Sequence, residues 1–97
     1  MTDDVDESFY DRADEHINLA NDQGREAARG KVSASFMYAV ARYNAWVSAS
    51  GFSSGADMKA AQVETIAFFT KQYQSMLEEN LNDYSKNFDC YMKAGMQ

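Results

Sequence analysis

The stretch that decides the fold is VSASFMYAVARYNAWV, residues 32–47. At about 100° per residue, its larger apolar side chains share one helical face, and a second face carries mainly small side chains. The first face comprises Val32, Phe36, Ala39, Val40, Tyr43, Trp46 and Val47. The second comprises Ala34, Met37, Ala41, Ala45 and Ser48. A helix that is apolar almost all round is a buried one, so we predict that residues 31–50 form the central helix.

An amphipathic segment precedes this helix. Its apolar side chains recur at helical spacing and predict a helix over about residues 4–22, with Asp3 or Asp4 as the N-cap. Gly24 follows the segment and is expected to stop it. The predicted apolar face comprises Val5, Phe9, Ala13, His16, Ile17 and Ala20.

The segment after the central helix begins with a loop. Gly51 to Gly55 combines two glycines with serines, and Ser54 or Asp57 is expected to cap a helix over about residues 57–82. No proline or glycine interrupts residues 56–94. Residues 83–93 therefore either continue the third helix or form a short fourth helix after a break near residues 80–83.

Composition places the chain in one class. Its 97 residues are 45% hydrophobic and 25% charged, as expected of one globular domain over residues 1–97. With helical periodicity throughout, we predict an all-α fold, a small bundle of three long helices. The single cysteine excludes a disulfide framework and indicates a reducing compartment. The acidic start is unlike a secretory signal, and no apolar run could span a membrane, so we expect a cytoplasmic protein without membrane contact.

Charge is unevenly distributed along the chain, whose net charge is −6. Residues 1–23 carry eight acids and one base, whereas residues 24–50 carry four bases and one acid. Four basic residues in an acidic chain are too few for a nucleic-acid-binding surface. We therefore expect no nucleic-acid partner.

No residue pattern points to catalysis. His16 is the only histidine and lies on the apolar side of its helix, so a dimetal site built from two Glu-x-x-His motifs is excluded. Cys90 has no histidine near it in the sequence. The segment from Gly24 to Ser33 departs from the P-loop spacing. We therefore predict a protein that is not an enzyme, with no catalytic residue, no metal site and no cofactor.

Three features favour self-association into a homodimer or higher oligomer. Phe68 lies on an otherwise polar face, as an interface residue would. Asn80 interrupts the apolar stripe of its helix, where a polar residue commonly fixes register. The central helix also needs cover on both faces. The candidate interface residues are Phe68, Ala34, Ala41 and Ala45.

The leading hypothesis is therefore a non-enzymatic helical interaction or regulatory module that self-associates. A first alternative is a small-ligand-binding bundle with an aromatic pocket. Its polar core or pocket would be lined by His16, Tyr43, Trp46, Tyr73 and Asn80. A second alternative is an acidic adaptor for an unidentified basic protein partner. It would present Asp6, Glu7, Asp11, Asp14 and Glu15.

Five blocks of sequence resemble a known family. They are FYDRAD at residues 9–14, INLAN at 17–21, YAVARYNAW at 38–46, FTKQY at 69–73 and MLEENLNDY at 76–84. Together they are similar to a small family of proteobacterial proteins, a domain of unknown function numbered 3144, over roughly residues 5–85. The resemblance implies a small helical protein of the bacterial cytoplasm and brings no catalytic or ligand residues with it.

Overall fold

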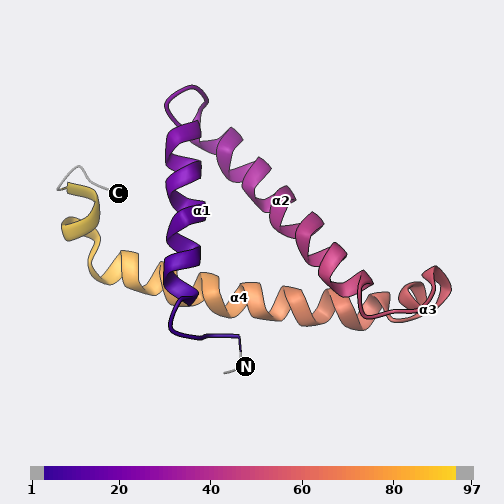
Figure 1. Ribbon diagram of the computed structural model, residues 1–97. Helices are drawn as coiled ribbons and strands as arrows, with labels where there is room; N and C mark the ends of the chain where they lie inside the picture. Colours follow the sequence, from indigo (N-terminus) through magenta and orange to yellow (C-terminus); the bar gives the residue numbers. More distant parts are fainter. Residues whose placement is uncertain (1–3, 94–97) are drawn as a thin grey trace. The chain divides into compact units, whose positions relative to one another are not determined.

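The computed structural model describes residues 4–93, which are built of helices (Figure 1). These are α1 (Phe9–Gln23), α2 (Arg29–Ala49), α3 (Gly55–Ala60), α4 (Gln62–Lys86) and one π-helical turn, η1 (Asp89–Lys93). No strand occurs in this part of the chain, which confirms the all-α prediction. The described residues up to Val47 form one compact unit and those from Ser48 form another. A single domain, and the packing of three long helices as one bundle, remain predictions.

Helix α1 begins five residues later than expected. The backbone N–H of Phe9 donates to the carbonyl oxygen of Asp6 at 3.1 Å, and the Asp6 carboxylate accepts from Arg12 at 2.8 Å. These bonds hold Asp6 in a turn ahead of the helix, because short acidic side chains compete with helical bonding. Asp4 is therefore no N-cap, and Asp3 lies outside the described residues. Gly24 is the C-cap, as predicted.

Helix α2 matches the predicted limits within two residues, but it is not buried. Within its unit it meets α1, from which it diverges after the turn at residues 24–28 (Figure 1). The rings of His16 and Phe36 lie 6.4 Å apart between the two helices. Val32 and Phe36 are half-buried, as are Phe9 and Ala13 of α1. The predicted apolar face of α1 is thus the less exposed one, whereas α1 alone covers only part of α2.

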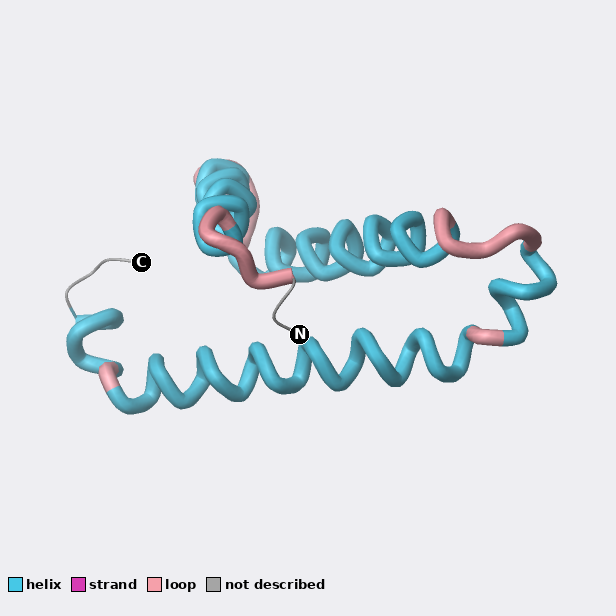
Figure 2. Tube along the Cα trace, turned by 60° about the horizontal axis from the view of Figure 1, so that its bottom comes forward, coloured by secondary structure: helices cyan, strands magenta, loops and turns pink. Residues whose placement is uncertain are grey.

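The predicted third helix is divided in two. Ser54 caps α3, since its hydroxyl oxygen accepts from the backbone N–H of Asp57 at 3.1 Å. Ala61, with φ −95° and ψ 5°, then separates α3 from α4, and Figure 2 shows this short break between the helices. The carbonyl oxygen of Ala61 accepts a bond from the Thr65 hydroxyl at 2.9 Å. Neither glycine nor proline marks the break, so the sequence predicted one continuous helix here.

Residues 83–93 partly continue the preceding helix and partly form a separate helical turn, so each of the two predicted alternatives is partly right. Helix α4 runs through residues 80–83 without a break and ends at Lys86. Asn87 has φ −113° and ψ 34°, and its side-chain amide donates to the carbonyl oxygen and the Oδ1 of Asp83, at 3.2 and 2.9 Å. The helix ends there, and η1 follows as a separate turn. None of the described helices is long and apolar enough to cross a membrane.

Candidate functional site

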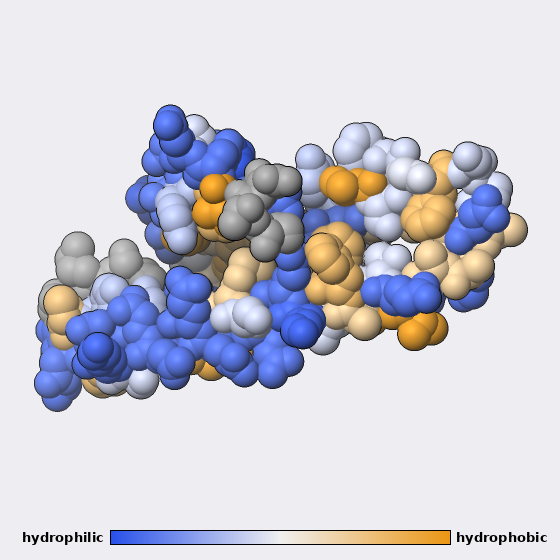
Figure 3. Space-filling view, turned by 90° about the horizontal axis from the view of Figure 1, so that it is seen from below, coloured by the Kyte–Doolittle hydropathy of each residue, from blue (hydrophilic) through white to orange (hydrophobic). Residues whose placement is uncertain are grey.

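Uncovered apolar surface is the dominant feature of both units. None of the described residues is buried, and large apolar side chains lie open to solvent on every long helix. Figure 3 shows such side chains in orange among hydrophilic ones on the face that it displays. Scattered apolar residues are normal on a protein surface, but contiguous patches of several hundred Å² mark interaction sites. The candidate site is therefore sought among these patches.

The first patch lies on α2 and consists of Tyr43 and Trp46, which we call the α2 aromatic patch. Their side chains are 64% and 65% exposed. The rings of Tyr43 and Trp46 lie 6.0 Å apart on the same helix. Tyrosine and tryptophan are enriched at protein interfaces because their large apolar rings carry a polar group at one end.

The second patch runs along α4, and we call it the α4 stripe. Its members recur at spacings of three, four and seven residues, which places them on one side of a helix. They are Val63, Ile66, Tyr73, Leu77 and Leu81, with exposures between 41% and 80%. The half-buried residues of this helix's first half, Thr65, Phe69 and Gln72, lie on a different face. The stripe is thus an apolar face that its own unit leaves open.

The predicted interface residues are all on the surface. Phe68 is 50% exposed, and its ring packs edge-on against Phe69 with the centroids 5.2 Å apart. Ala34, Ala41 and Ala45 of α2 are exposed as well. All four positions are therefore open to a partner, although no contact within the chain shows what would cover them.

The five residues proposed for a polar core or pocket are exposed instead. His16 lies beside Phe36, and Tyr43 beside Trp46, but neither pair is enclosed. Tyr73 and Asn80 belong to the other unit, where the Asn80 amide donates to the carbonyl oxygen of Met76 in its own helix at 2.8 Å. Because the five residues belong to two units that are described separately, the pocket stays a prediction; within its own helix, Asn80 is satisfied locally.

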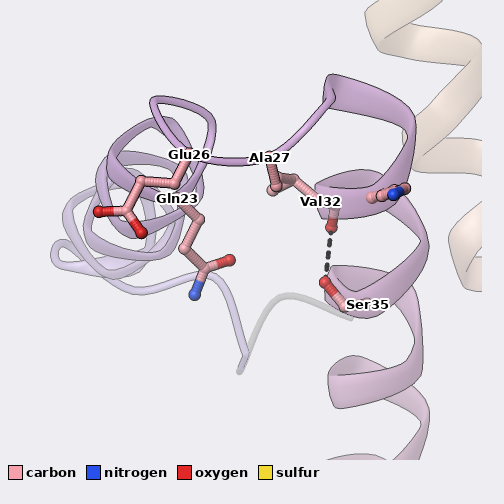
Figure 4. A pocket seen from close by; sticks show the side chains of 6 residues that line it. Gln23, Glu26, Ala27, Val32 and Ser35 are labelled. Carbon is pink, nitrogen blue, oxygen red and sulfur yellow. Dashed lines mark hydrogen bonds between the residues drawn. The ribbon is translucent and has the colours of Figure 1, made fainter.

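An open hollow of about 390 Å³ occupies the turn between α1 and α2. In Figure 4, Gln23 and Glu26 line one side of it, and Val32 and Ser35 belong to the first turns of α2. Ala27 and Lys31 complete the lining, and sequence reasoning singled out none of the six for a pocket. The Ser35 hydroxyl donates to the carbonyl oxygen of Val32 at 3.1 Å. Because no lining side chain is buried, the hollow lacks the fixed polar groups that orient a ligand.

A cluster of hydrogen-bonded polar groups surrounds Asp83 near the end of α4. Its Oδ2 accepts a bond from the Tyr91 hydroxyl at 2.7 Å, and Tyr91 stacks on Tyr84 with ring centroids 4.3 Å apart. The bond to Asp83 raises the pKa of Tyr91 above its usual value, because an anionic acceptor favours the protonated phenol. These contacts hold η1 against α4, and a structural role explains all of them.

Charged side chains form no site for a metal ion in the part of the chain that the structure describes. No group of three histidine, cysteine, aspartate or glutamate residues is arranged to bind one there. Cys90 is exposed and is not in a disulfide. The Asp6–Arg12 ion pair lowers the pKa of Asp6 through the hydrogen bond between the two side chains. This pair stabilises the start of α1.

Comparison with known proteins agrees with the resemblance seen in the sequence. The family described as "Protein of unknown function (DUF3144)" matches residues 9–85. An NMR structure of the protein NB7890A from Shewanella sp is 42% identical, with a TM-score of 0.76 over 97% of this chain and 99% of that chain. No curated protein matches. A match over most of the chain, together with a relative of the same fold and length, shows that the chain belongs to the DUF3144 family of proteins of unknown function.

Proposed function

We propose that this protein is a non-enzymatic helical interaction module that works as a homo-oligomer in the bacterial cytoplasm. The observation that carries the proposal is the uncovered surface. Within each unit taken by itself, no described residue is buried, and large apolar side chains stay open to solvent on every long helix.

Extensive apolar interfaces are typical of obligate homo-oligomers. A second copy is the partner that requires no further component, because oligomers of identical chains with closed symmetry are the commonest assemblies.

The remaining parts of the proposal rest on chemistry. The single cysteine fits a reducing compartment, and an acidic chain is a poor partner for nucleic acid. No described group of side chains combines a nucleophile with a base, which favours binding over catalysis.

Native mass spectrometry and sedimentation velocity of the untagged protein test the proposal. We expect a species at a whole multiple of 10.9 kDa with no added mass. A compact monomer would refute self-association, since it would mean that the two units cover each other within one chain. A retained small molecule of a few hundred daltons would instead favour the ligand-binding alternative.

A further inference from the structure

Three side chains meet across a bend at the end of α4, where η1 turns away from the helix axis (Figure 1). The Tyr91 hydroxyl donates to Oδ2 of Asp83 at 2.7 Å. The ring of Tyr91 stacks on that of Tyr84, with centroids 4.3 Å apart and planes 24° apart. We call Asp83, Tyr84 and Tyr91 the C-terminal clasp. Among the described residues 73–93, these three alone are half-buried, which agrees with the contacts that they make with one another.

The backbone keeps helical hydrogen bonds on both sides of the bend. The N–H of Asn87 donates to the carbonyl oxygen of Asp83 at 3.0 Å, and the N–H of Tyr91 donates to that of Asn87 at 3.1 Å. Both bonds join residues four apart, as in an α-helix. Asn87 itself, with φ −113° and ψ 34°, departs from helical values. Because neither glycine nor proline occurs in residues 62–93, the local sequence also permits α4 to continue through the bend.

A continuous helix and the clasp exclude each other. In an α-helix, residues 84 and 91 are separated by about 10 Å along the axis. Their side chains lean in the same direction, so the rings could not approach to the 4.3 Å of the stack. The bond from Tyr91 to Asp83 would likewise have to span about 12 Å of helical rise. The end of α4 therefore has two competing arrangements, a bent one with the clasp and a straight one without it.

We infer that the C-terminal clasp is a conformational switch: when the contact between Tyr91 and Asp83 opens, residues 87–93 continue α4 as an α-helix. In the open state the helix runs from Gln62 to Lys93, seven residues and about 10 Å longer. Opening also separates the two phenol rings and exposes their stacked faces. The clasp closes only while the Tyr91 hydroxyl keeps its hydrogen, since the Asp83 carboxylate is an acceptor. All these residues belong to one unit, so the inference does not rest on self-association.

The clasp is strong enough to decide between the two arrangements. The bend interrupts the helix only near its end, where helices fray and little stability is lost. A hydrogen bond to a carboxylate is worth a factor of roughly 10–100 in an equilibrium constant. Asn87 favours the same arrangement, because its side-chain amide donates to Oδ1 of Asp83 at 2.9 Å and asparagine is a poor helix former.

Two variants that each lose one phenol hydroxyl test the clasp. Tyr91→Phe removes the bond to Asp83 and keeps the ring, whereas Tyr84→Phe removes the hydroxyl that is not the donor to Asp83. We expect Tyr91→Phe to lower the ratio of bent to straight chains by about tenfold. Tyr84→Phe is expected to change this ratio by less than about twofold. The NMR Cα shifts of residues 87–93, together with nuclear Overhauser contacts between the two rings, report the ratio.

The double variant Asn87→Ala, Tyr91→Phe removes the side-chain bonds to Asp83 from both residues. We expect α-helical shifts through Lys93 and no contact between the rings of residues 84 and 91. Random-coil shifts over residues 87–93 would overturn the switch, because the segment would then fray and not extend the helix. A bend that persists in the double variant, or an equal response to Tyr84→Phe and Tyr91→Phe, would also overturn it. Helical circular dichroism checks that the other helices stay folded.

Sedimentation velocity on the same samples separates failure of this inference from failure of the proposed function. A wild-type monomer with contacts between the rings of Tyr84 and Tyr91 would refute self-association and support the clasp. A wild-type oligomer without these contacts would refute the clasp alone.

Discussion

If association supplies the missing core, thermal stability must depend on protein concentration. Binding to the folded state alone raises its stability by mass action. A tenfold increase in concentration adds about 1.4 kcal/mol per dimer. The unfolding entropy of two 97-residue chains is about 0.4 kcal/mol/K. The Tm is therefore expected to rise by about 3 °C for each tenfold increase, and by about 7 °C over a hundredfold range.

Trp46 gives this experiment a second readout, because it is the only tryptophan and is 65% exposed in the single chain. Thermal melts followed by circular dichroism give the Tm at each concentration. The emission of Trp46 before heating shows whether the ring is covered, and we expect it to move to shorter wavelength as the concentration rises. A Tm that is constant within about 1 °C over the hundredfold range, with a monomeric mass throughout, would refute the reasoning.

Three further predictions concern local contacts. Ser54→Ala removes the side-chain cap of α3 and is expected to cost about 1 kcal/mol in urea unfolding, whereas Ser54→Asp, which keeps an acceptor, should cost much less. Arg12 lowers the pKa of Asp6 below 3.8, so the pair's stabilising contribution is present above that pH and is lost as the pH falls through the lower, folded value. An NMR titration should give Asp6 a lower pKa in the wild-type protein than in the Arg12→Gln variant. Equal pKa values for Asp6 in the two proteins would contradict the ion pair. Asp83 raises the pKa of Tyr91 above 10.0, so the contribution of their bond is complete below pH 10.0 and is lost at higher pH. In an ultraviolet titration of the tyrosines, Asp83→Asn should lower the pKa of the phenol that ionises last. An unchanged titration curve would exclude the hydrogen bond between Tyr91 and Asp83.

Local signals in the sequence predicted the helices well. Gly24 was predicted to end the first helix, and Ser54 or Asp57 to cap the helix after the loop; the structure has Gly24 as the C-cap of α1 and Ser54 as the N-cap of α3. Each depends on the chemistry of one residue and its neighbours within a turn. The breaks at Ala61 and Asn87 were missed because no residue type announces them. At both places a side-chain bond, from Thr65 to the carbonyl oxygen of Ala61 and from Asn87 to that of Asp83, is made beside the usual backbone bond and not in place of it.

Burial was predicted much less well, for a different physical reason. Periodicity identifies which face of a helix needs apolar cover, but not which element supplies the cover. The face that includes Phe9 and Ala13 was predicted correctly, since a neighbouring helix in the same unit partly covers it. Tyr43 and Trp46, which one alternative hypothesis places in an aromatic pocket, are exposed within their own unit. A side chain destined for an interface between chains has the same composition and spacing as one destined for a core.

Neither described unit has a buried core of its own, so the apolar faces of its helices need cover from outside the unit. Helices of 15, 21 and 25 residues are marginal in water when they stand alone, because most helical stability in proteins comes from packing of an apolar face. The chain also loses conformational entropy in every residue that it orders. If a second copy supplies the cover, the cost of ordering these helices is offset only when the chains meet. The uncovered apolar faces would then contribute to the folding of the chain as well as to the recognition of its partner.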